Sequence, residues 1–507
     1  MNGRNRICFA MSAIALAGLC VLSAARAATS DTVATSWEVG LDTERWQLPA
    51  DETAGVAGLH LRRNFGEHLR LGVDSFAAVQ GRRGGFITLG VGGEYVYPLT
   101  RHVDVEGGFS VSAGGGRGGH ELSGGGLLLR ESIGLGLPLG AWRWRAGISH
   151  IDFPNGGSIT GTQWYAGLEH SFRGLSVDPS DTSDRFRLTE TSAFTPSDLG
   201  VYGRQYRVRH GSVTEAGRPQ ANFGVVGAQW RGTISGPWYY MVDAAGAAHG
   251  SSNGYMEIMG GVGLRLPLTS TWSLDAGVSL GAGGGGAVST GGGMLVAARV
   301  GAEWSFSPQN VLAVGVERLK APNGHLDTDG VSITLRRRFG PDHITTVDAG
   351  DVAALDTHPV RVRVTEQSYR AAGAAWSTRP IPNIGVLGVQ ADYDLNDLWY
   401  MTGQGLAAYR GQSGAYMTGL VGAGLHLGMS SGLRVEAEAL AGAAGGGGVA
   451  VASGAVGQVN VGLGYEWRNG VGVHATIGRI RSLHGTFAAN VAGLSISYRT
   501  KLLSGSS

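Results

Sequence analysis

Serine and histidine side chains that could support nucleophilic catalysis occur at four places in the chain. The pattern G-x-S-x-G stands at 250–254 and 277–281, and two serine–histidine neighbours are Ser149–His150 and His170–Ser171. A nucleophile in this pattern needs a strand–turn–helix elbow, and a serine needs its histidine base within hydrogen-bond reach. We expect a hairpin tip at 250–254 and strands at the other places, where adjacent side chains point to opposite faces. The sequence therefore predicts no catalytic residue.

Carboxylates and guanidinium groups suggest a different chemistry, the filling of a narrow barrel by ion pairs. Glu106, Asp275 and Glu436 occupy one equivalent position in three similar segments, and Arg130 and Arg299 are equivalent on the next expected strand. Buried carboxylates and arginines form short, charge-assisted hydrogen bonds. We therefore predict that these five side chains form an acid–arginine network inside a lumen.

Nucleic-acid, metal and phosphate sites find no support. The chain has 40 Lys and Arg against 39 Asp and Glu, a net charge of +1, and the long basic runs of nucleic-acid-binding proteins are missing. His343 and His358 are too far apart for metal-ligand spacing, so we expect them to be solvated. The glycine-rich runs lack the G-x-x-x-x-G-K-[ST] pattern of a phosphate loop. We expect no metal and no cofactor.

The N-terminal segment 1–27 has the pattern of an export signal. Arg4 and Arg6 precede an apolar run at 7–22, and Ala25-Arg26-Ala27 has the small-x-small form of a cleavage site. We predict cleavage after Ala27, which also removes both cysteines of the chain. No later stretch offers the roughly 18 uncharged apolar residues of a membrane helix, so a mature chain in a membrane would cross it as strands.

Glycine is unusually abundant, at 88 of 507 residues. The 15 prolines and the lack of a G-x-y period exclude collagen, and 43% hydrophobic residues exclude a disordered chain. The sequence instead repeats itself, since Phe86, Tyr255 and Tyr416 are equivalent at shifts of 169 and 161 residues. We place the three units at 32–173, 199–340 and 360–501, with polar linkers at 174–198 and 341–359.

Each unit is predicted to contain eight antiparallel strands, about 24 in all. Apolar and polar residues alternate through 103–113, which is the period of a strand with two unlike faces, and its length suits a tilted membrane strand. In the first unit we expect strands near 34–43, 55–64, 68–79, 86–98, 102–113, 126–139, 142–153 and 162–172.

The connections differ between the two ends of each unit. Turns such as 98–102 are short at the end where a unit begins, whereas 45–54 and 114–125 at the other end are long and rich in glycine. Aromatic residues gather at the short-turn end, where we predict a girdle at the membrane interface. Its members are Trp142, Trp238, Tyr239, Trp272, Trp304, Trp399, Tyr400 and Trp467.

With these features the chain resembles the Gram-negative outer-membrane β-barrel superfamily, in architecture and with no named functional family. The resemblance implies an all-β, antiparallel, up-and-down transmembrane barrel in the outer membrane after removal of the signal. It also implies contact with outer-membrane lipid and lipopolysaccharide, and with the barrel assembly machinery. Units one and two end in Phe172 and Phe339, the type of aromatic that this machinery recognises, while residues continue beyond Tyr498 in the third.

Two architectures are open, three tandem small barrels or one large barrel. We favour three, because an ion-pair network suits a narrow lumen and the linkers are long for the short-turn end. Three narrow barrels favour a structural, scaffolding or binding role at the cell envelope, with a surface protein or polysaccharide as a further partner. One large barrel would be a porin-like channel or export pore, and a lipid-modifying enzyme is a third alternative. We expect the glycine-rich loops to be flexible surface loops.

Overall fold

The computed structural model describes residues 33–116, 119–177, 185–187, 192–194, 197–252, 254–339, 345–348, 352–372, 376–377, 383–411, 413–430 and 432–505. The predicted signal and its cleavage site lie outside these residues. Strands dominate the described part, and its short helix α2 (Gly119–Ser123) lies in a loop. Helices with the length and hydropathy to span a bilayer are missing from this described part.

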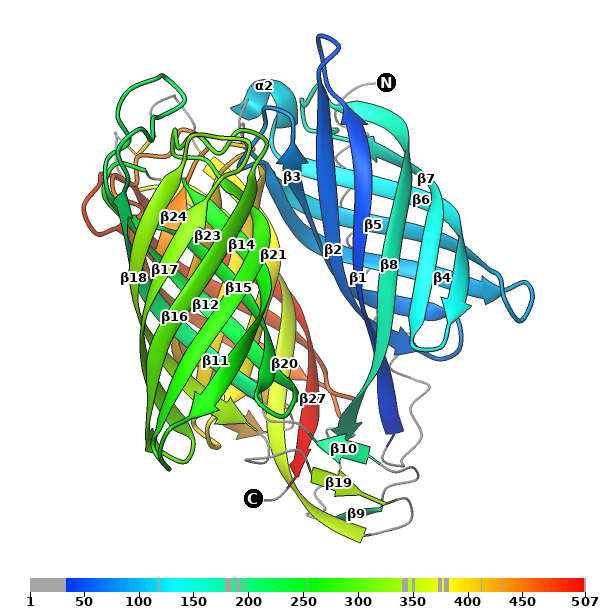
Figure 1. The fold of residues 1–507 in the computed structure, drawn as a ribbon. Helices are drawn as coiled ribbons and strands as arrows, with labels where there is room; N and C mark the ends of the chain where they lie inside the picture. The colour runs from blue at the N-terminus through cyan, green and yellow to red at the C-terminus, as the bar shows by residue number, and fades with distance from the viewer. Residues whose placement is uncertain are drawn as a thin grey trace.

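The chain forms three closed eight-stranded barrels, which confirms the predicted fold class (Figure 1). Barrel 1 consists of β1 (Val33–Gln47), β2 (Thr53–Phe65), β3 (Leu69–Gln80), β4 (Ile87–Pro98), β5 (Asp104–Gly115), β6 (Leu127–Leu139), β7 (Trp142–Asp152) and β8 (Thr160–Val177). Barrel 2 consists of β11 (Ser197–Val208), β12 (Phe223–Ser235), β13 (Trp238–His249), β14 (Met256–Pro267), β15 (Trp272–Gly284), β16 (Met294–Ser307), β17 (Asn310–Lys320) and β18 (Asp327–Phe339). Barrel 3 consists of β20 (Val352–Ala371), β21 (Asn383–Asp394), β22 (Trp399–Arg410), β23 (Met417–Ser430), β24 (Leu433–Gly445), β25 (Ala455–Glu466), β26 (Val471–Ser482) and β27 (Ala488–Gly505).

Each barrel closes on itself, because its first strand pairs antiparallel with its eighth. The closing pairs are β1 with β8, β11 with β18, and β20 with β27. The single large barrel that the sequence left open is therefore wrong. Such a barrel would need the first and last strands of neighbouring units to pair with each other along their full length. In the structure these strands pair within their own unit, so no edge is left for the neighbour.

The linkers between barrels contain short strands of their own. β10 (Ser192–Phe194) in the first linker pairs with β19 (Thr345–Val347) in the second, and β9 (Arg185–Arg187) pairs with the extended start of β20. β8 and β27 also run past the barrel walls and pair through Leu502 with Ser176 and Lys501 with Val177. Figure 1 shows these segments together below the barrels, at the short-turn end.

The barrel walls have polar interiors and apolar exteriors. In β7, Arg143 and Arg145 are buried, while Trp142, Trp144 and Ile148 are exposed. This is the reverse of a water-soluble barrel, and it is the arrangement that lets a strand face lipid on one side.

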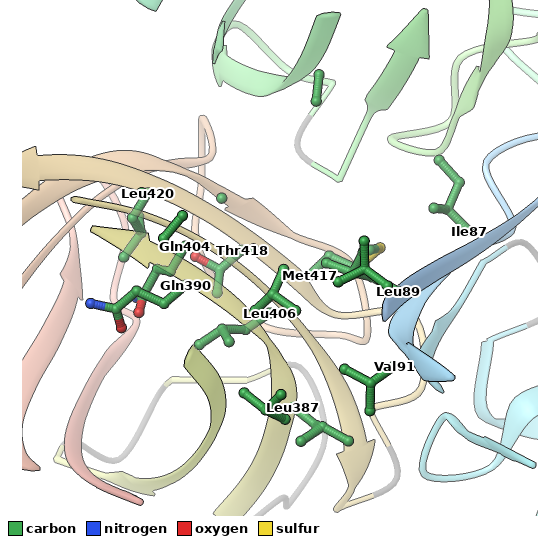
Figure 2. Close-up of a pocket in the computed structure, with 18 of the residues that line it drawn as sticks. Ile87, Leu89, Val91, Leu387, Gln390, Gln404, Leu406, Met417, Thr418 and Leu420 are labelled. Carbon is green, nitrogen blue, oxygen red and sulfur yellow. The ribbon is translucent and has the colours of Figure 1, made fainter. Parts of the chain in front are cut away.

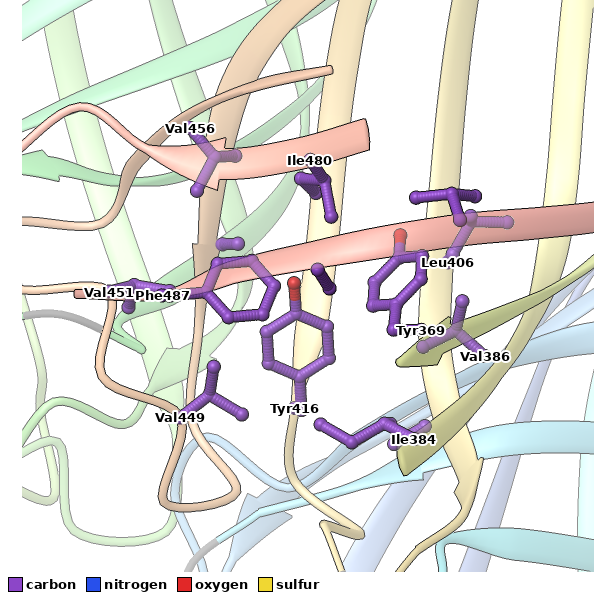
Figure 3. Packing of buried hydrophobic residues seen from close by; sticks show 14 of the residues in the cluster. Tyr369, Ile384, Val386, Leu406, Tyr416, Val449, Val451, Val456, Ile480 and Phe487 are labelled. Atoms are coloured by element: carbon purple, nitrogen blue, oxygen red, sulfur yellow. The ribbon is translucent and has the colours of Figure 1, made fainter. Parts of the chain in front are cut away.

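The loop end of every lumen is filled by apolar side chains. Figure 3 shows this cluster in barrel 3, where the rings of Tyr369, Tyr416 and Phe487 lie 6.0–6.5 Å apart. Barrel 2 has Tyr206, Phe223 and Tyr255 in the same layer, and barrel 1 has a cluster around Trp46 and three phenylalanines. One member recurs in all three clusters, as Phe86, Tyr255 and Tyr416. The lumens are thus closed at the loop end by packed rings.

The three barrels form a ring with approximate threefold order. The third strand of each barrel contacts the fifth strand of another: β3 meets β15, β13 meets β24, and β22 meets β5. In Figure 1, barrel 1 (blue to cyan) lies beside barrel 2 (green) and barrel 3 (yellow to red). Because each contact joins two different surfaces and the rotation closes, this is the head-to-tail arrangement of a cyclic trimer within one chain.

Glycines make these contacts at the loop end, and we call them the glycine collar. Gly126, Gly293 and Gly454 have φ angles of +94°, +100° and +96°. A Cβ added to them would lie 2.1, 2.3 and 1.9 Å from the carbonyl oxygens of Ala408, Ala78 and Ala247 on the neighbouring barrel. These glycines therefore pack between barrels, where the sequence predicted surface loops. The high glycine content alone suggests flexible loops, but glycine is required there because a second barrel approaches closely.

Candidate functional site: the three lumens

The lumen of barrel 1 is filled with ion pairs below its apolar cluster. Glu169 lies at the centre, with its two carboxylate oxygens 2.6 Å from Arg143 and 2.6 Å from Arg145. Arg145 also lies 2.6 Å from Glu94 and 2.7 Å from Glu106, and Glu106 pairs again with Arg143. All five side chains are buried. Each arginine thus pairs with two or more carboxylates, and the network spans the lumen.

Barrel 2 achieves the same filling from other strands. Arg231 of β12 lies 3.0 Å from Asp275 and 2.7 Å from Glu303, which also pairs with Arg336 of β18. Tyr239 donates a hydrogen bond to Asp275 at 2.5 Å. Nearer the loop end, a second group of carboxylates surrounds Arg204 at 3.0–3.1 Å.

Barrel 3 combines a small ionic group with amides. Arg361 and Arg363 of β20 bind Asp392 at 2.7 and 2.6 Å and Glu436 at 2.6 and 3.0 Å. Glu438 instead accepts hydrogen bonds mainly from neutral groups, which are Gln390, Tyr400 and Asn460. Toward the loop end, a closed ring of three glutamines spans the lumen. Its members are Gln367, Gln404 and Gln458, each donating to the next at 3.1–3.4 Å.

The structure places all five predicted network residues inside lumens, but it brings few of them together. Asp275 and Arg299 share one lumen at 4.0 Å, and Arg299 is nearer to Asp243 at 3.2 Å. Arg130 does not pair with Glu106 and lies 2.7 Å from Glu44 instead. Glu436 meets β20 arginines that the sequence did not single out.

The arginines that carry the networks were therefore missed. Arg143 and Arg145, and likewise Arg361 and Arg363, stand two residues apart between apolar neighbours. In a strand this spacing puts both charges on the polar face, and that signal was available. Their partners were not, because these depend on how the strands stagger when the barrel closes.

Two members of the predicted aromatic girdle are corrected. Tyr239 and Tyr400 are buried in lumens, where they donate hydrogen bonds to Asp275 and Glu438. Each directly follows a tryptophan in its strand, so only one of the two neighbours can face lipid. The six tryptophans are exposed on the outer walls at the short-turn end. They are Trp142, Trp238, Trp272, Trp304, Trp399 and Trp467.

The serine–histidine neighbours are divided by the barrel wall. Ser149 is buried and accepts a hydrogen bond from Gln163, whereas His150 is exposed and lies 2.9 Å from Thr162. The ring of His170 packs against Trp142, with centroids 4.4 Å apart. Ser252 of the 250–254 motif is buried and accepts a hydrogen bond from Gln220.

Comparison with known proteins gives matches only among solved structures. No protein-family model and no curated protein sequence matches the chain. The siderophore receptor PirA from Pseudomonas aeruginosa aligns at 11% identity and a TM-score of 0.28, over 93% of this chain and 81% of the receptor. OccK8 (OprE) from the same organism aligns at 10% and 0.23, over 93% of this chain and all of OccK8.

A shorter match covers about one barrel. The Yersinia pestis outer membrane protein Ail aligns at 14% identity and a TM-score of 0.21, over 29% of this chain and 99% of Ail. The TM-scores are low, so the fold described above rests on strand pairing alone.

Proposed function

We propose that this chain is an integral protein of a Gram-negative outer membrane and acts there as a closed scaffold or binding platform, without catalysis or a cofactor. Outer-membrane lipid and lipopolysaccharide surround it, and the barrel assembly machinery inserts it after the export signal is removed. Its loops face outward, where a surface protein or polysaccharide can bind.

The observation that carries the proposal is the double closure of each lumen. Packed aromatic rings fill the loop end, and buried charged or amide side chains span the interior below them. A solute would have to break ion pairs in a medium of low dielectric constant, where removing one partner leaves an uncompensated charge. Closed lumens favour a structural or binding role over transport.

The outer walls support the membrane location. Ile133, Val316 and Ile477, one in each barrel, expose 64%, 53% and 66% of their surface. Large aliphatic side chains exposed at this level are costly in water and favourable against lipid. The tryptophans at the short-turn end add the aromatic belt that marks the periplasmic interface.

The test is conductance of the purified wild-type chain in planar bilayers, after fractionation of the cells. We expect the protein in the outer-membrane fraction, with a heat-dependent shift in gel mobility and no steady conductance. A porin measured in the same bilayers is the positive control. Large stable conductance steps would overturn the closed-scaffold proposal, and a chain recovered in the periplasm without detergent would overturn the membrane location.

A further inference from the structure

A large, mainly apolar cavity lies between the three barrels. Its volume is about 2560 Å³, several-fold more than the roughly 300–1,000 Å³ of a typical small-molecule pocket. All three barrels line it, mostly through outward-facing residues, and barrel 3 also contributes Gln404 of its lumen wall. Figure 2 shows Ile87, Leu89 and Val91 of β4 on one side and Leu387 and Met417 of barrel 3 on the other.

The glycine collar and further glycine contacts between the barrels close this cavity at the loop end. The amide of Gly84 in barrel 1 donates to the carbonyl of Gly291 in barrel 2 at 3.0 Å, and Gly414 in barrel 3 donates to Gly124 in barrel 1 at 3.2 Å. Immediately below, one buried apolar cluster draws on all three barrels. It includes Val111, Leu127, Ala282, Leu387 and Met417. These contacts close the cavity at the loop end.

The cavity extends from the collar to the short-turn end. There its lining includes Trp37, Arg63 and Phe65 of barrel 1 and Tyr498 of barrel 3. In a membrane, an apolar space of this size excludes water, and an empty one would forfeit the dispersion contacts of its walls. Acyl chains are the material at that depth that can fill it.

Arg63 supplies a charge at the mouth of the cavity. Its guanidinium lies over the rings of Phe65 and Tyr498, at 5.2 and 5.3 Å from their centroids. Among the described residues, no group accepts a hydrogen bond from its buried Nε. An arginine that lies over two rings and has an unused donor is suited to bind a phosphate group.

We propose that the central cavity holds a phospholipid of the periplasmic leaflet, with its acyl chains between the barrels and its phosphate on Arg63. The inference rests on the proposed outer-membrane location, which sets the collar on the outer side. Lipopolysaccharide reaches the protein from the loop side, where the collar closes the cavity. Phospholipid enters from the short-turn end, where the cavity is lined by an arginine and aromatic rings as a lipid headgroup region requires.

The experiment measures lipid that remains with the purified full-length chain. The protein is washed in a detergent that strips lipid from the outer walls, and the bound lipid is identified and counted by native mass spectrometry. We expect at least one phospholipid per wild-type chain. Leu89→Trp, which fills the cavity, and Arg63→Gln, which removes the charge, should each lower the retained phospholipid at least threefold.

Matched controls come from the same barrel. Leu135→Trp adds the same bulk to an outer wall away from the cavity, and Arg101→Gln removes an exposed arginine from a periplasmic turn; both should retain wild-type lipid. Less than one phospholipid per wild-type chain, retained lipopolysaccharide in its place, or equal losses in the controls would overturn the proposal. Outer-membrane fractionation and heat-dependent mobility are measured on the same samples, so a failed membrane location is recognised separately.

Discussion

Barrels 1 and 3 have the same strand arrangement but fill their lumens with different side chains. In barrel 1, the two arginines of β7 each pair with several carboxylates, and both bind Glu169, which also lies 2.9 Å from His60. In barrel 3, Arg361 and Arg363 share Asp392 and Glu436, and the glutamine ring spans the lumen nearer the loop end. The apolar cluster at the loop end is present in both.

This difference shows which features the repeat retains. The acid on the fifth strand is kept as Glu106, Asp275 or Glu436, and the strand that supplies its arginine changes from barrel to barrel. A closed lumen needs its volume filled and its buried charges paired. Many sets of side chains meet both demands, so the networks are free to diverge while the fold is maintained.

The largest effect should come from the centre of the barrel 1 network. Glu169→Gln removes one of the carboxylates that Arg143 and Arg145 share, and breaking a buried ion pair costs about 3–5 kcal/mol. We expect the free energy of unfolding in urea, followed by the heat-dependent gel shift, to fall by about that amount. A fall below about 1 kcal/mol would show that water or neighbouring acids already compensate these arginines.

The glycine collar should respond equally in all barrels, unlike the lumens. Gly126→Ala, Gly293→Ala and Gly454→Ala each place a methyl group against a neighbouring carbonyl and strain a positive φ, at a cost of about 1–3 kcal/mol. We expect similar gains in protease cleavage of the loops. Gly140→Ala has φ +65° but open space around it, so it separates strain from contact. Unequal effects among the three would contradict the threefold order.

The smallest effect should come from Glu438→Gln in barrel 3. The nearest arginine nitrogen, on Arg363, is 3.5 Å away, and the neutral donors around Glu438 can also bind an amide oxygen. We expect a loss of about 1 kcal/mol in the same urea titration. A loss equal to that of Glu169→Gln would mean that the two lumens depend on charge to the same degree.

The fold class follows from the sequence because alternation is local. Strand alternation and turn length depend on residues that are close together in the sequence. The repeat is visible when the copies are aligned. The same logic places Glu106 and Asp275 on inward faces. It also implies that Trp238 and Tyr239 cannot both face lipid, although the aromatic cluster was interpreted as one group.

The rest depends on contacts between segments far apart in the chain. Arg130 meets Glu44 because β6 and β1 face each other across the closed lumen, a distance set by stagger and tilt. The collar arises where Gly126 approaches Ala408, nearly three hundred residues away, on another barrel. No periodicity within one unit records how that unit packs against the next.

The pairing of β8 with β27 joins the first barrel to the last strand of the third. This backbone pairing can form only when the end of β27, the last strand of the third barrel, lies beside the end of β8. A chain in which β27 is not yet in place would therefore leave the end of β8 as an open strand edge at the short-turn end.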